Sequence, residues 1–431
     1  MSREGSVSGA QGIALGVLGA ILLGLSLYHF AASSHAAVAR GVVDFPIFLQ
    51  HAEQFLETGQ LYYHADYLAA YGPGSPVYKF PPLYALFLLP LVRDGIHDSV
   101  YLYHWGLQIL LYLGTVVLCV RSLRTRRVGP LALAAALLAL NFEPFFETLW
   151  RLQIETPLLL LLAICFWALR RDRQGLAGVS LGICVMLKVY PGFLLFYFLA
   201  RRRWRAILSC ALTMLALQCA TLLVFGAHEN WVYFSRILPA MMGEAATIST
   251  ENLGLGRYVQ ELFGAGPMVA KRTGQLIVLG LLGASLWLVH RARGRGRGLE
   301  ATGLEFSLFV ALMVFSLPNS WVNYQLLLLI PYLVLIAHAL ETEAGAWKVW
   351  TPLAVGAFLL LFYQPCADPA VVDWPCAQTP RFLGLVQLPR AFHDRMVELR
   401  VVGTLAPLLT ALVLLLRAPK SRKQAPDLAP E

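Results

Sequence analysis

Charged residues are scarce in this sequence. They make up 14% of its 431 residues, whereas hydrophobic residues make up 58%, and the mean hydropathy is +0.63. Soluble domains carry about 25% charged residues, so this balance excludes water-soluble dehydrogenases, hydrolases and DNA-binding domains. Apolar runs such as Gly12 to Ala32, Val100 to Val120 and Ala206 to Gly226 have the length of a helix that crosses a hydrocarbon core of about 30 Å. The sequence predicts a polytopic membrane protein.

The sequence also lacks a long polar segment that would build a nucleic-acid-binding face. Its net charge is +9, but more than half of its 34 Lys and Arg residues lie in five short blocks beside apolar stretches. These blocks are Arg121 to Arg127, Arg170 to Arg173, Arg201 to Arg205, Arg291 to Arg297 and Arg417 to Lys423. Because such blocks mark the cytoplasmic side of a membrane protein, we expect membrane lipids and no nucleic acid as partners.

Metal-ligand patterns are missing as well. His51, His64 and His228 show no metal-ligand spacing, so the sequence predicts no metal and no other cofactor. Five of the seven Cys residues lie inside apolar stretches, where a thiol packs as a small hydrophobic group. The other two, Cys366 and Cys376, lie in a polar, Pro-rich loop on the predicted external side, where we expect a structural disulfide.

The predicted fold is an all-α transmembrane bundle with both termini in the cytoplasm and about 12 crossings, in a range of about 10 to 13. Residues 1–416 form one domain, beginning with a retained first helix, and residues 417–431 form a tail that we expect to be disordered. The predicted external loops cover residues 33–80, 227–267 and 365–398. Pro81 to Val92 is apolar but only about 18 Å long as a helix, which favours a re-entrant or interfacial segment.

A second short pair of apolar segments lies between Gly175 and Ala200. Two half-segments meet at Leu187-Lys-Val-Tyr-Pro191, and each is too short to cross an unthinned bilayer. Lys188 would then lie at membrane depth and line a protein cavity. A single tilted crossing is the alternative, and it would place one Arg block outside.

Ionisable and polar residues that are not topology marks gather near the predicted external apices, which predicts an external cavity beside the membrane. They are Asp44, His51, Glu53, Asp66, Tyr78, Lys79, Glu143, Glu147, Arg151, Gln153, Glu155, Lys188, Glu251, Asn252, Arg257, Asn319, Trp321 and Asn323.

Several motifs in this set resemble the bacterial glycosyltransferase family 87 proteins of the GT-C superfamily. The motifs are Asp44-Phe-Pro-Ile-Phe, Thr58-Gly-Gln-Leu-Tyr-Tyr63, Val77-Tyr-Lys-Phe-Pro-Pro-Leu-Tyr84, Leu152-Gln-Ile-Glu155, Leu187-Lys-Val-Tyr-Pro191 with Arg201-Arg-Arg-Trp-Arg205, Glu251-Asn-Leu-Gly-Leu255 and Ser316-Leu-Pro-Asn-Ser-Trp-Val-Asn-Tyr324. They follow the family's order over about 300 residues. The resemblance implies a GT-C fold and a mannosyltransferase or arabinofuranosyltransferase that uses a polyprenyl-phosphate sugar.

Two positions depart from the family pattern. The family usually continues after Trp321 with Asp and one or two His, where this chain has Val322, Asn323 and Tyr324. The Gly of the family's Gly-Gln pair is replaced by Leu152. The first departure puts a His-assisted step in doubt, and together they weaken the transfer of substrate identity.

Transfer from a lipid-phosphate sugar to a hydroxyl needs one base for the acceptor proton and positive charge for the departing phosphate. Asp44 is our candidate base because it closely follows the first helix and matches the family's catalytic Asp. An N-cap role on a helix over Phe48 to Leu56 is the structural alternative. Asp66 is the reserve base.

The candidate substrate contacts each have a structural alternative. Lys188 is expected to contact the donor phosphate, unless it forms an ion pair with Glu147 or Glu155; Arg257 is a second phosphate candidate or a solvated loop residue. Sugar hydroxyls are expected at Gln153, Asn252 and Asn323, whose amides also suit helix-end capping. Trp321 and Tyr78 would stack on a sugar face or prenyl chain, or lie in the interfacial aromatic belt. Lys79 completes the predicted binding residues.

The leading functional hypothesis is an inverting transferase in the bacterial plasma membrane. It would move a hexose, most simply mannose, from polyprenyl phosphate to a glycolipid or polysaccharide on the extracytoplasmic side. The alternatives are a polyprenyl-phosphate-arabinose-dependent arabinofuranosyltransferase, a lipid-sugar flippase or transporter, and a non-catalytic scaffold. Alternating access is disfavoured because the chain shows no internal repeat.

Overall fold

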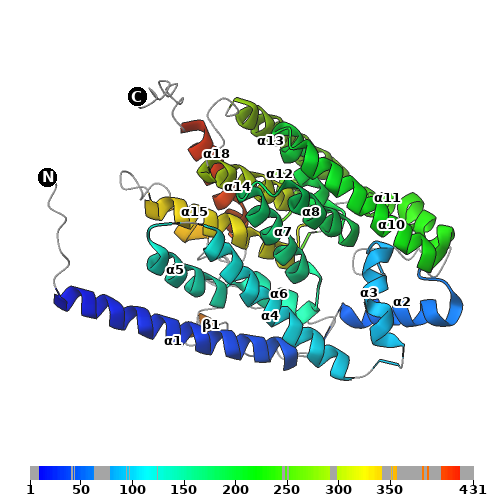
Figure 1. Cartoon of the computed structure of the whole chain (residues 1–431), viewed down its shortest axis with the longest axis horizontal. Helices are drawn as coiled ribbons and strands as arrows, with labels where there is room; N and C mark the ends of the chain where they lie inside the picture. The colour runs from blue at the N-terminus through cyan, green and yellow to red at the C-terminus, as the bar shows by residue number, and fades with distance from the viewer. Residues whose placement is uncertain are drawn as a thin grey trace, which may run out of the picture.

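The computed structural model of the protein is a bundle of α-helices (Figure 1). The structure describes residues 9–39, 42, 44–62, 78–93, 95–96, 98–123, 125–244, 248–249, 252–291, 299–341, 351, 353–356, 381–382, 386–387 and 399–417. The predicted helical class is confirmed. Within these ranges the strands are β1 (Arg381–Phe382) and β2 (Val386–Gln387), which pair antiparallel. Cys366 and Cys376 lie outside the described residues, so the expected disulfide stays a prediction.

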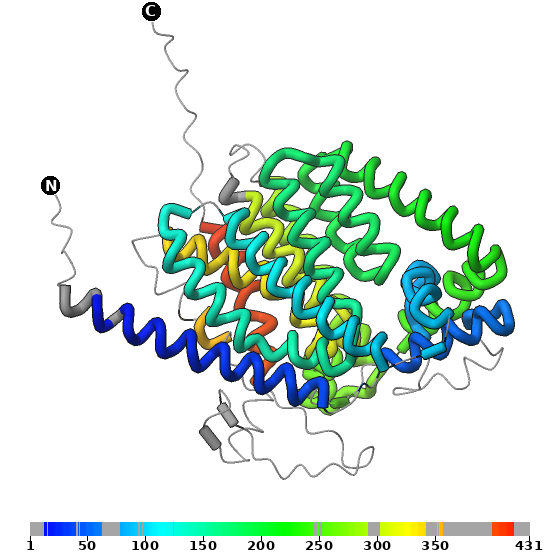
Figure 2. Tube along the Cα trace, turned by 60° about the horizontal axis from the view of Figure 1, so that its bottom comes forward, coloured from blue at the N-terminus to red at the C-terminus, as the bar shows by residue number. Residues whose placement is uncertain are grey.

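The first four helices are two long ones and two short ones. One long helix lies at the edge of the bundle, and the two short helices lie together at one end. α1 (Gly9–Ala39) runs along one edge, and α4 (Asp98–Ser122) lies beside the central helices (Figures 1 and 2). α2 (Phe45–Thr58) and α3 (Pro82–Val92) pack together near the C-terminal end of the long helix α10 (Trp204–Val232). The short apolar segment after residue 80 is therefore a separate helix of 11 residues, as its length predicted.

The middle of the chain supplies α5 (Val128–Leu140), α6 (Glu143–Arg151), α7 (Glu155–Arg170), α8 (Gln174–Leu187), the 3₁₀ turn η2 (Tyr190–Phe193), α9 (Leu194–Ala200) and α10 (Trp204–Val232). The predicted break between the two half-segments is confirmed at Lys188, whose backbone is extended (φ −156°, ψ 126°). Inside α10, Gly226 has non-helical angles (φ 75°, ψ 172°), which kink the helix. A positive φ of this kind favours glycine.

The last part of the bundle contains the π-helix η3 (Tyr233–Ile237), α11 (Leu238–Gly243), α12 (Leu255–Phe263), α13 (Pro267–Arg291), α14 (Leu299–Phe315), the 3₁₀ turn η5 (Val322–Leu328), α15 (Leu329–Glu341) and α18 (Val401–Arg417). Much of the predicted external loop over residues 227–267 is thus helical. The segment Leu255–Phe263 explains part of this, because Leu255, Val259 and Leu262 recur at the spacing of one helix face.

Five described helices are long and apolar enough to cross a membrane, or six if the bent pair α5 and α6 counts as one span. Five shorter apolar helices accompany them: Pro82–Val92, Gln174–Leu187, Tyr190–Ala200, Thr302–Phe315 and Val401–Arg417. Large apolar side chains such as Leu223, Leu276 and Ile13 point out of the bundle, as expected for a surface in contact with lipid. The chain is a multi-pass membrane protein, and the predicted number of 12 crossings is not confirmed.

α7 and α8 form an antiparallel hairpin that determines where the site lies. Asp172 closes its turn with a left-handed backbone (φ 53°). α8 then packs on α10 so closely that a Cβ on Gly178 would lie 2.1 Å from the Ala206 carbonyl oxygen. Because the two helices of the hairpin have 16 and 14 residues, the residue that begins α7, Glu155, lies next to the residue that follows α8, Lys188.

Candidate active site

Asp44 begins α2 without capping it through its side chain. Its backbone carbonyl oxygen accepts hydrogen bonds from the backbone N–H groups of Ile47 (3.1 Å) and Phe48 (3.4 Å), while its carboxylate makes no capping hydrogen bond. An uncapped N-terminus gives up roughly 0.5–2 kcal/mol of helix stability. The carboxylate is thus directed to partners outside its own helix.

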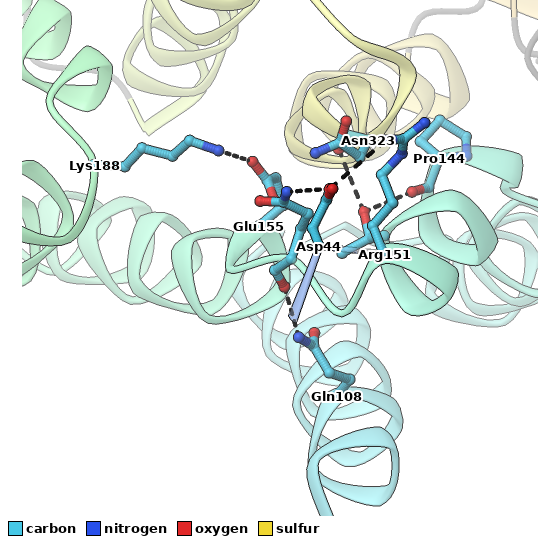
Figure 3. Close-up of polar contacts among 9 residues, drawn as sticks. Asp44, Gln108, Pro144, Arg151, Glu155, Lys188 and Asn323 are labelled. Carbon is cyan, nitrogen blue, oxygen red and sulfur yellow. Dashed lines mark hydrogen bonds and ion pairs between the residues drawn. The ribbon is translucent and has the colours of Figure 1, made fainter. Parts of the chain in front are cut away.

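Those partners come from the turn between α6 and α7. The amide Nε2 of Gln153 donates a hydrogen bond of 2.6 Å to Oδ2 of Asp44, and Nη1 of Arg151 lies 3.6 Å from the same oxygen. Figure 3 shows Asp44 between Arg151 and Glu155, with Gln108 of α4 reaching toward the same turn. Among the described residues, the hydrogen bond and the ion pair of the Asp44 carboxylate both use Oδ2.

The turn owes its shape to Leu152. This residue ends α6 in the left-handed conformation (φ 48°, ψ 45°) and is buried. The backbone N–H of Gln153 then bonds to the Thr148 carbonyl at 3.1 Å, and Gln108 Nε2 bonds to the Gln153 carbonyl at 2.6 Å. A left-handed leucine costs roughly 1–2 kcal/mol, so the geometry gives a physical reason for glycine at this position in the family pattern.

Glu155 and Lys188 form a buried ion pair beside Asp44 (Figure 3). Glu155 is fully buried, and the Lys188 side chain is 11% exposed. The Lys188 ammonium also lies 4.1 Å from the ring centroid of Tyr324, 5.0 Å from that of Phe80 and 5.7 Å from that of Tyr190, distances at which cations are attracted to aromatic rings. The ion-pair alternative for Lys188 is therefore the contact that the structure contains.

The other cations named by the sequence have carboxylate partners too. Lys79 Nζ lies 3.0 Å from Glu244 Oε1, and both side chains are about a quarter exposed. Arg151 Nε lies 2.5 Å from Glu147 Oε1, in a pair one helical turn apart. A donor phosphate would have to exchange with one of these carboxylates.

We call Asp44, Arg151, Gln153, Glu155 and Lys188 the Asp44 cluster. A second group, the Asn252 cluster, consists of Asn252, Arg257, Asn319, Ser320 and Trp321. In it, Asn252 Oδ1 accepts from the backbone N–H groups of Gly254 and Ser320, both at 2.9 Å, and its Nδ2 donates to Asn319 Oδ1 at 2.9 Å.

The rest of the Asn252 cluster is joined by backbone contacts. Asn252 and Trp321 form an isolated antiparallel bridge. Arg257 is buried, and it bonds to Glu261 Oε1 at 2.7 Å and to the Asn252 carbonyl at 3.3 Å. These residues thus tie the segment before α12 to the segment before η5.

The remaining predicted residues lie in different surroundings. Tyr78 is fully buried among aromatic rings, and its hydroxyl donates to the Pro81 carbonyl at 3.1 Å. Asn323 is buried near the α6 turn, where its carbonyl lies 3.4 Å from Thr148 Oγ1. Asp66 lies outside the described residues. His51 bonds to the Leu61 carbonyl at 3.0 Å, and burial lowers the pKa of its imidazole.

Sequence reasoning gave no role to Tyr84 of α3. Its side chain is buried, and its hydroxyl makes no hydrogen bond to any residue that the structure describes. A tyrosine inside an apolar segment is usually a packing or interfacial residue, so Tyr84 stands out only by its buried hydroxyl without a partner in the described chain. Across the described part of the chain, no three His, Cys, Asp or Glu residues gather as a metal site would need, and the absence of a metal stays a prediction.

Comparisons with known proteins give a family. A model of glycosyltransferase family 87 matches residues 78–318, more than half of the chain. An α-(1→3)-arabinofuranosyltransferase of Mycobacterium tuberculosis is 26% identical over 303 residues, which cover 69% of this chain and 65% of that protein, so the chain spans slightly less than two thirds of its length.

A mannosyltransferase and a solved structure are also similar to this chain. A polyprenol-phosphate-mannose-dependent α-(1-2)-phosphatidylinositol pentamannoside mannosyltransferase of the same species is 26% identical over 336 residues, covering 75% of this chain and 74% of that protein. The crystal structure of ArnT from Cupriavidus metallidurans bound to undecaprenyl phosphate aligns with 95% of this chain and 77% of that chain, at a TM-score of 0.43 and 15% identity.

Proposed function

Because the chain belongs to glycosyltransferase family 87, we propose that it transfers a hexose, most simply mannose, from a polyprenyl-phosphate donor to a glycolipid or polysaccharide hydroxyl. The observation that carries the proposal is the Asp44 carboxylate. It makes no helix cap and is instead held by Gln153 and Arg151 through Oδ2. A direct displacement of the lipid phosphate needs a single positioned carboxylate as base, whereas glycosidases use a pair of carboxylates.

In the proposed step Asp44 is the general base. Its Oδ1 takes the proton of the acceptor hydroxyl while the hydroxyl oxygen bonds to the anomeric carbon. The bond from that carbon to the phosphate oxygen breaks, and its electron pair leaves with the polyprenyl phosphate. Attack opposite to the leaving group inverts the anomeric centre. Base catalysis of this kind contributes roughly 10²–10⁴-fold to a rate.

The cost of exchanging carboxylates favours Lys79 as the main contact of the departing phosphate. The Lys79–Glu244 pair is partly exposed, and such pairs contribute only about 0–1 kcal/mol, so Lys79 can trade Glu244 for phosphate easily. Glu155 is fully buried, and removing one partner from a buried pair costs about 3–5 kcal/mol. We therefore assign Lys188 to holding Glu155 and give it a secondary role toward the phosphate.

Arabinofuranose is the second candidate for the transferred sugar. The mycobacterial arabinofuranosyltransferase and the mannosyltransferase are each 26% identical to this chain, so similarity alone does not rank the two sugars. Mannose is the simpler proposal because the mannosyltransferase is matched over more of its own length.

We further place the site on the external face of the bacterial plasma membrane, with both termini in the cytoplasm. The five Arg-rich blocks support this orientation. The proposed arrangement keeps about 12 crossings, of which the described helices account for five or six by length and composition.

The test uses purified protein in lipid nanodiscs with a crude membrane-lipid extract as acceptor. Radiolabelled polyprenyl-phosphate mannose and polyprenyl-phosphate arabinose are offered separately. Transfer of mannose label by the wild type supports the main proposal, and transfer of arabinose label alone selects the second candidate. Label that crosses the bilayer of proteoliposomes without joining an acceptor would refute both and indicate a flippase.

A further inference from the structure

Three polar side-chain atoms close to Asp44 have no hydrogen-bond partner among the residues that the structure describes. They are Tyr84 Oη, Gln153 Oε1 and Glu155 Oε2, and all three are buried. Native proteins satisfy about 90% or more of such groups, because each unsatisfied one costs roughly 1–3 kcal/mol. Such atoms are the ones that a ligand or an ordered water would satisfy.

The three atoms belong to two segments, α3 and the start of α7. Glu155 begins α7, and Gln153 lies two residues before it. Gln153 bonds to Asp44 through Nε2, and Glu155 pairs with Lys188 through Oε1. Tyr84 approaches from α3. Its ring centroid lies 5.1 Å from that of Phe80, whose own centroid lies 5.0 Å from the Lys188 ammonium. Phe80 therefore contacts both Tyr84 and the Lys188 ammonium of the Asp44 cluster.

The chemistry of these atoms selects the ligand. Tyr84 offers a hydroxyl that donates and accepts, whereas Gln153 Oε1 and the Glu155 carboxylate only accept. A phosphate, which is also an acceptor and is negatively charged, would be repelled by Glu155. A sugar hydroxyl both donates and accepts, so it can bond to all three groups.

We propose that Tyr84, Gln153 and Glu155 form a subsite for the hydroxyls of a sugar ring next to Asp44, with Tyr84 as its hydrogen-bond donor. The subsite rests on the proposed function, because it orients a sugar toward the Asp44 carboxylate. The sugar belongs either to the donor or to the acceptor.

The test is a cycle that combines Tyr84→Phe with deoxygenated substrates, in the nanodisc assay with the full chain. Tyr84→Phe should lower kcat/KM about tenfold. The control is Tyr197→Phe, which removes a hydroxyl of α9 that is also buried and without a partner in the described chain, but lies near Arg201 and Glu305. This control should stay within about twofold of the wild type.

Mono-deoxy donors and mono-deoxy acceptors identify the hydroxyl that Tyr84 contacts. At one position, removal of the substrate hydroxyl should cost the wild type about tenfold and Tyr84→Phe almost nothing, because the bond is already lost. A sensitive position on the donor assigns the subsite to the transferred sugar, and one on the acceptor assigns it to the acceptor. Equal penalties in both proteins at every position overturn the subsite.

A binding measurement separates this inference from the proposed function. Methyl α-mannoside and methyl α-arabinofuranoside are titrated at millimolar concentration while the unfolding midpoint is followed. Stabilisation of the wild type and Tyr197→Phe but not of Tyr84→Phe supports the subsite, even if no lipid-linked donor is used. A wild type that neither transfers sugar nor is stabilised by either glycoside overturns the subsite.

Discussion

The Asp44 cluster and the Asn252 cluster contain the same kinds of side chain and use them differently. Around Asp44, polar atoms of Gln153 and Glu155 are buried without partners in the described chain. Around Asn252, the amide bonds to two backbone N–H groups and to Asn319, and Arg257 is held by Glu261. The first arrangement has capacity left for a substrate, whereas the second holds two chain segments together. We therefore expect the Asp44 cluster to control activity, with a share of the stability resting on its buried Glu155–Lys188 pair, and the Asn252 cluster to control stability alone.

The largest effect should come from breaking the buried pair of the Asp44 cluster. Lys188→Met leaves the Glu155 carboxylate buried and unpaired, so the free energy of unfolding should fall by about 3–5 kcal/mol. Denaturation in detergent, followed by tryptophan fluorescence, measures this loss.

Two variants serve as controls for the buried pair. The double variant Lys188→Met with Glu155→Gln should recover most of the stability, because neither charge is then buried alone. Arg257→Met should lower the free energy of unfolding by less than Lys188→Met does, because Glu261, the partner of Arg257, is 35% exposed. A Lys188→Met protein as stable as the wild type would contradict the buried pair.

The next prediction concerns the Asn252 cluster. Asn252→Ala leaves the backbone N–H groups of Gly254 and Ser320 without their acceptor, which should lower the free energy of unfolding by about 2–6 kcal/mol at roughly 1–3 kcal/mol per buried group. Transfer per folded molecule should stay near the wild-type value. If activity fell while the unfolding midpoint held, Asn252 would belong to the substrate site and the division into two clusters would fail.

The smallest effect on stability should come from Lys79. Its pair with Glu244 is partly exposed, so Lys79→Met should change the free energy of unfolding by about 1 kcal/mol or less. The KM for the lipid-phosphate donor should rise about tenfold, since a charge-assisted bond to phosphate is lost. Steady-state kinetics with varied donor measure this. Glu244→Gln is the matched variant, and an increase in KM as large as that of Lys79→Met would show that the pair itself matters.

Local sequence features predicted those parts of the fold that depend on segment length. The 12 residues before Arg93 and the two half-segments around Lys188 were too short to span a bilayer, and both appear as separate short helices. The helical content of residues 227–267 was missed, because polar residues interrupt this stretch and keep its apolar runs short.

The site was predictable in its members more than in their partners. The chemistry of Asp44, Gln153 and Lys188 identifies them as candidates, but Asp44 and Gln153 are 109 residues apart, and pairing over such a separation depends on helix packing. The same holds for Asn252 and Ser320, which are 68 residues apart. Tyr84 entered the sequence analysis only as the last residue of the motif Val77 to Tyr84, because its hydroxyl stands out only when its buried surroundings are known.

The most direct test of the account is the first-turnover rate of Asp44→Asn at saturating donor and acceptor. The carboxylate makes no helix cap, so the unfolding midpoint should stay within about 2 °C of the wild type and donor affinity should be unchanged. Asp172→Asn, in the exposed turn between α7 and α8, is the matched control and should keep full activity. The account predicts a rate lowered about 10²–10⁴-fold. A rate equal to that of the wild type would contradict Asp44 as the base.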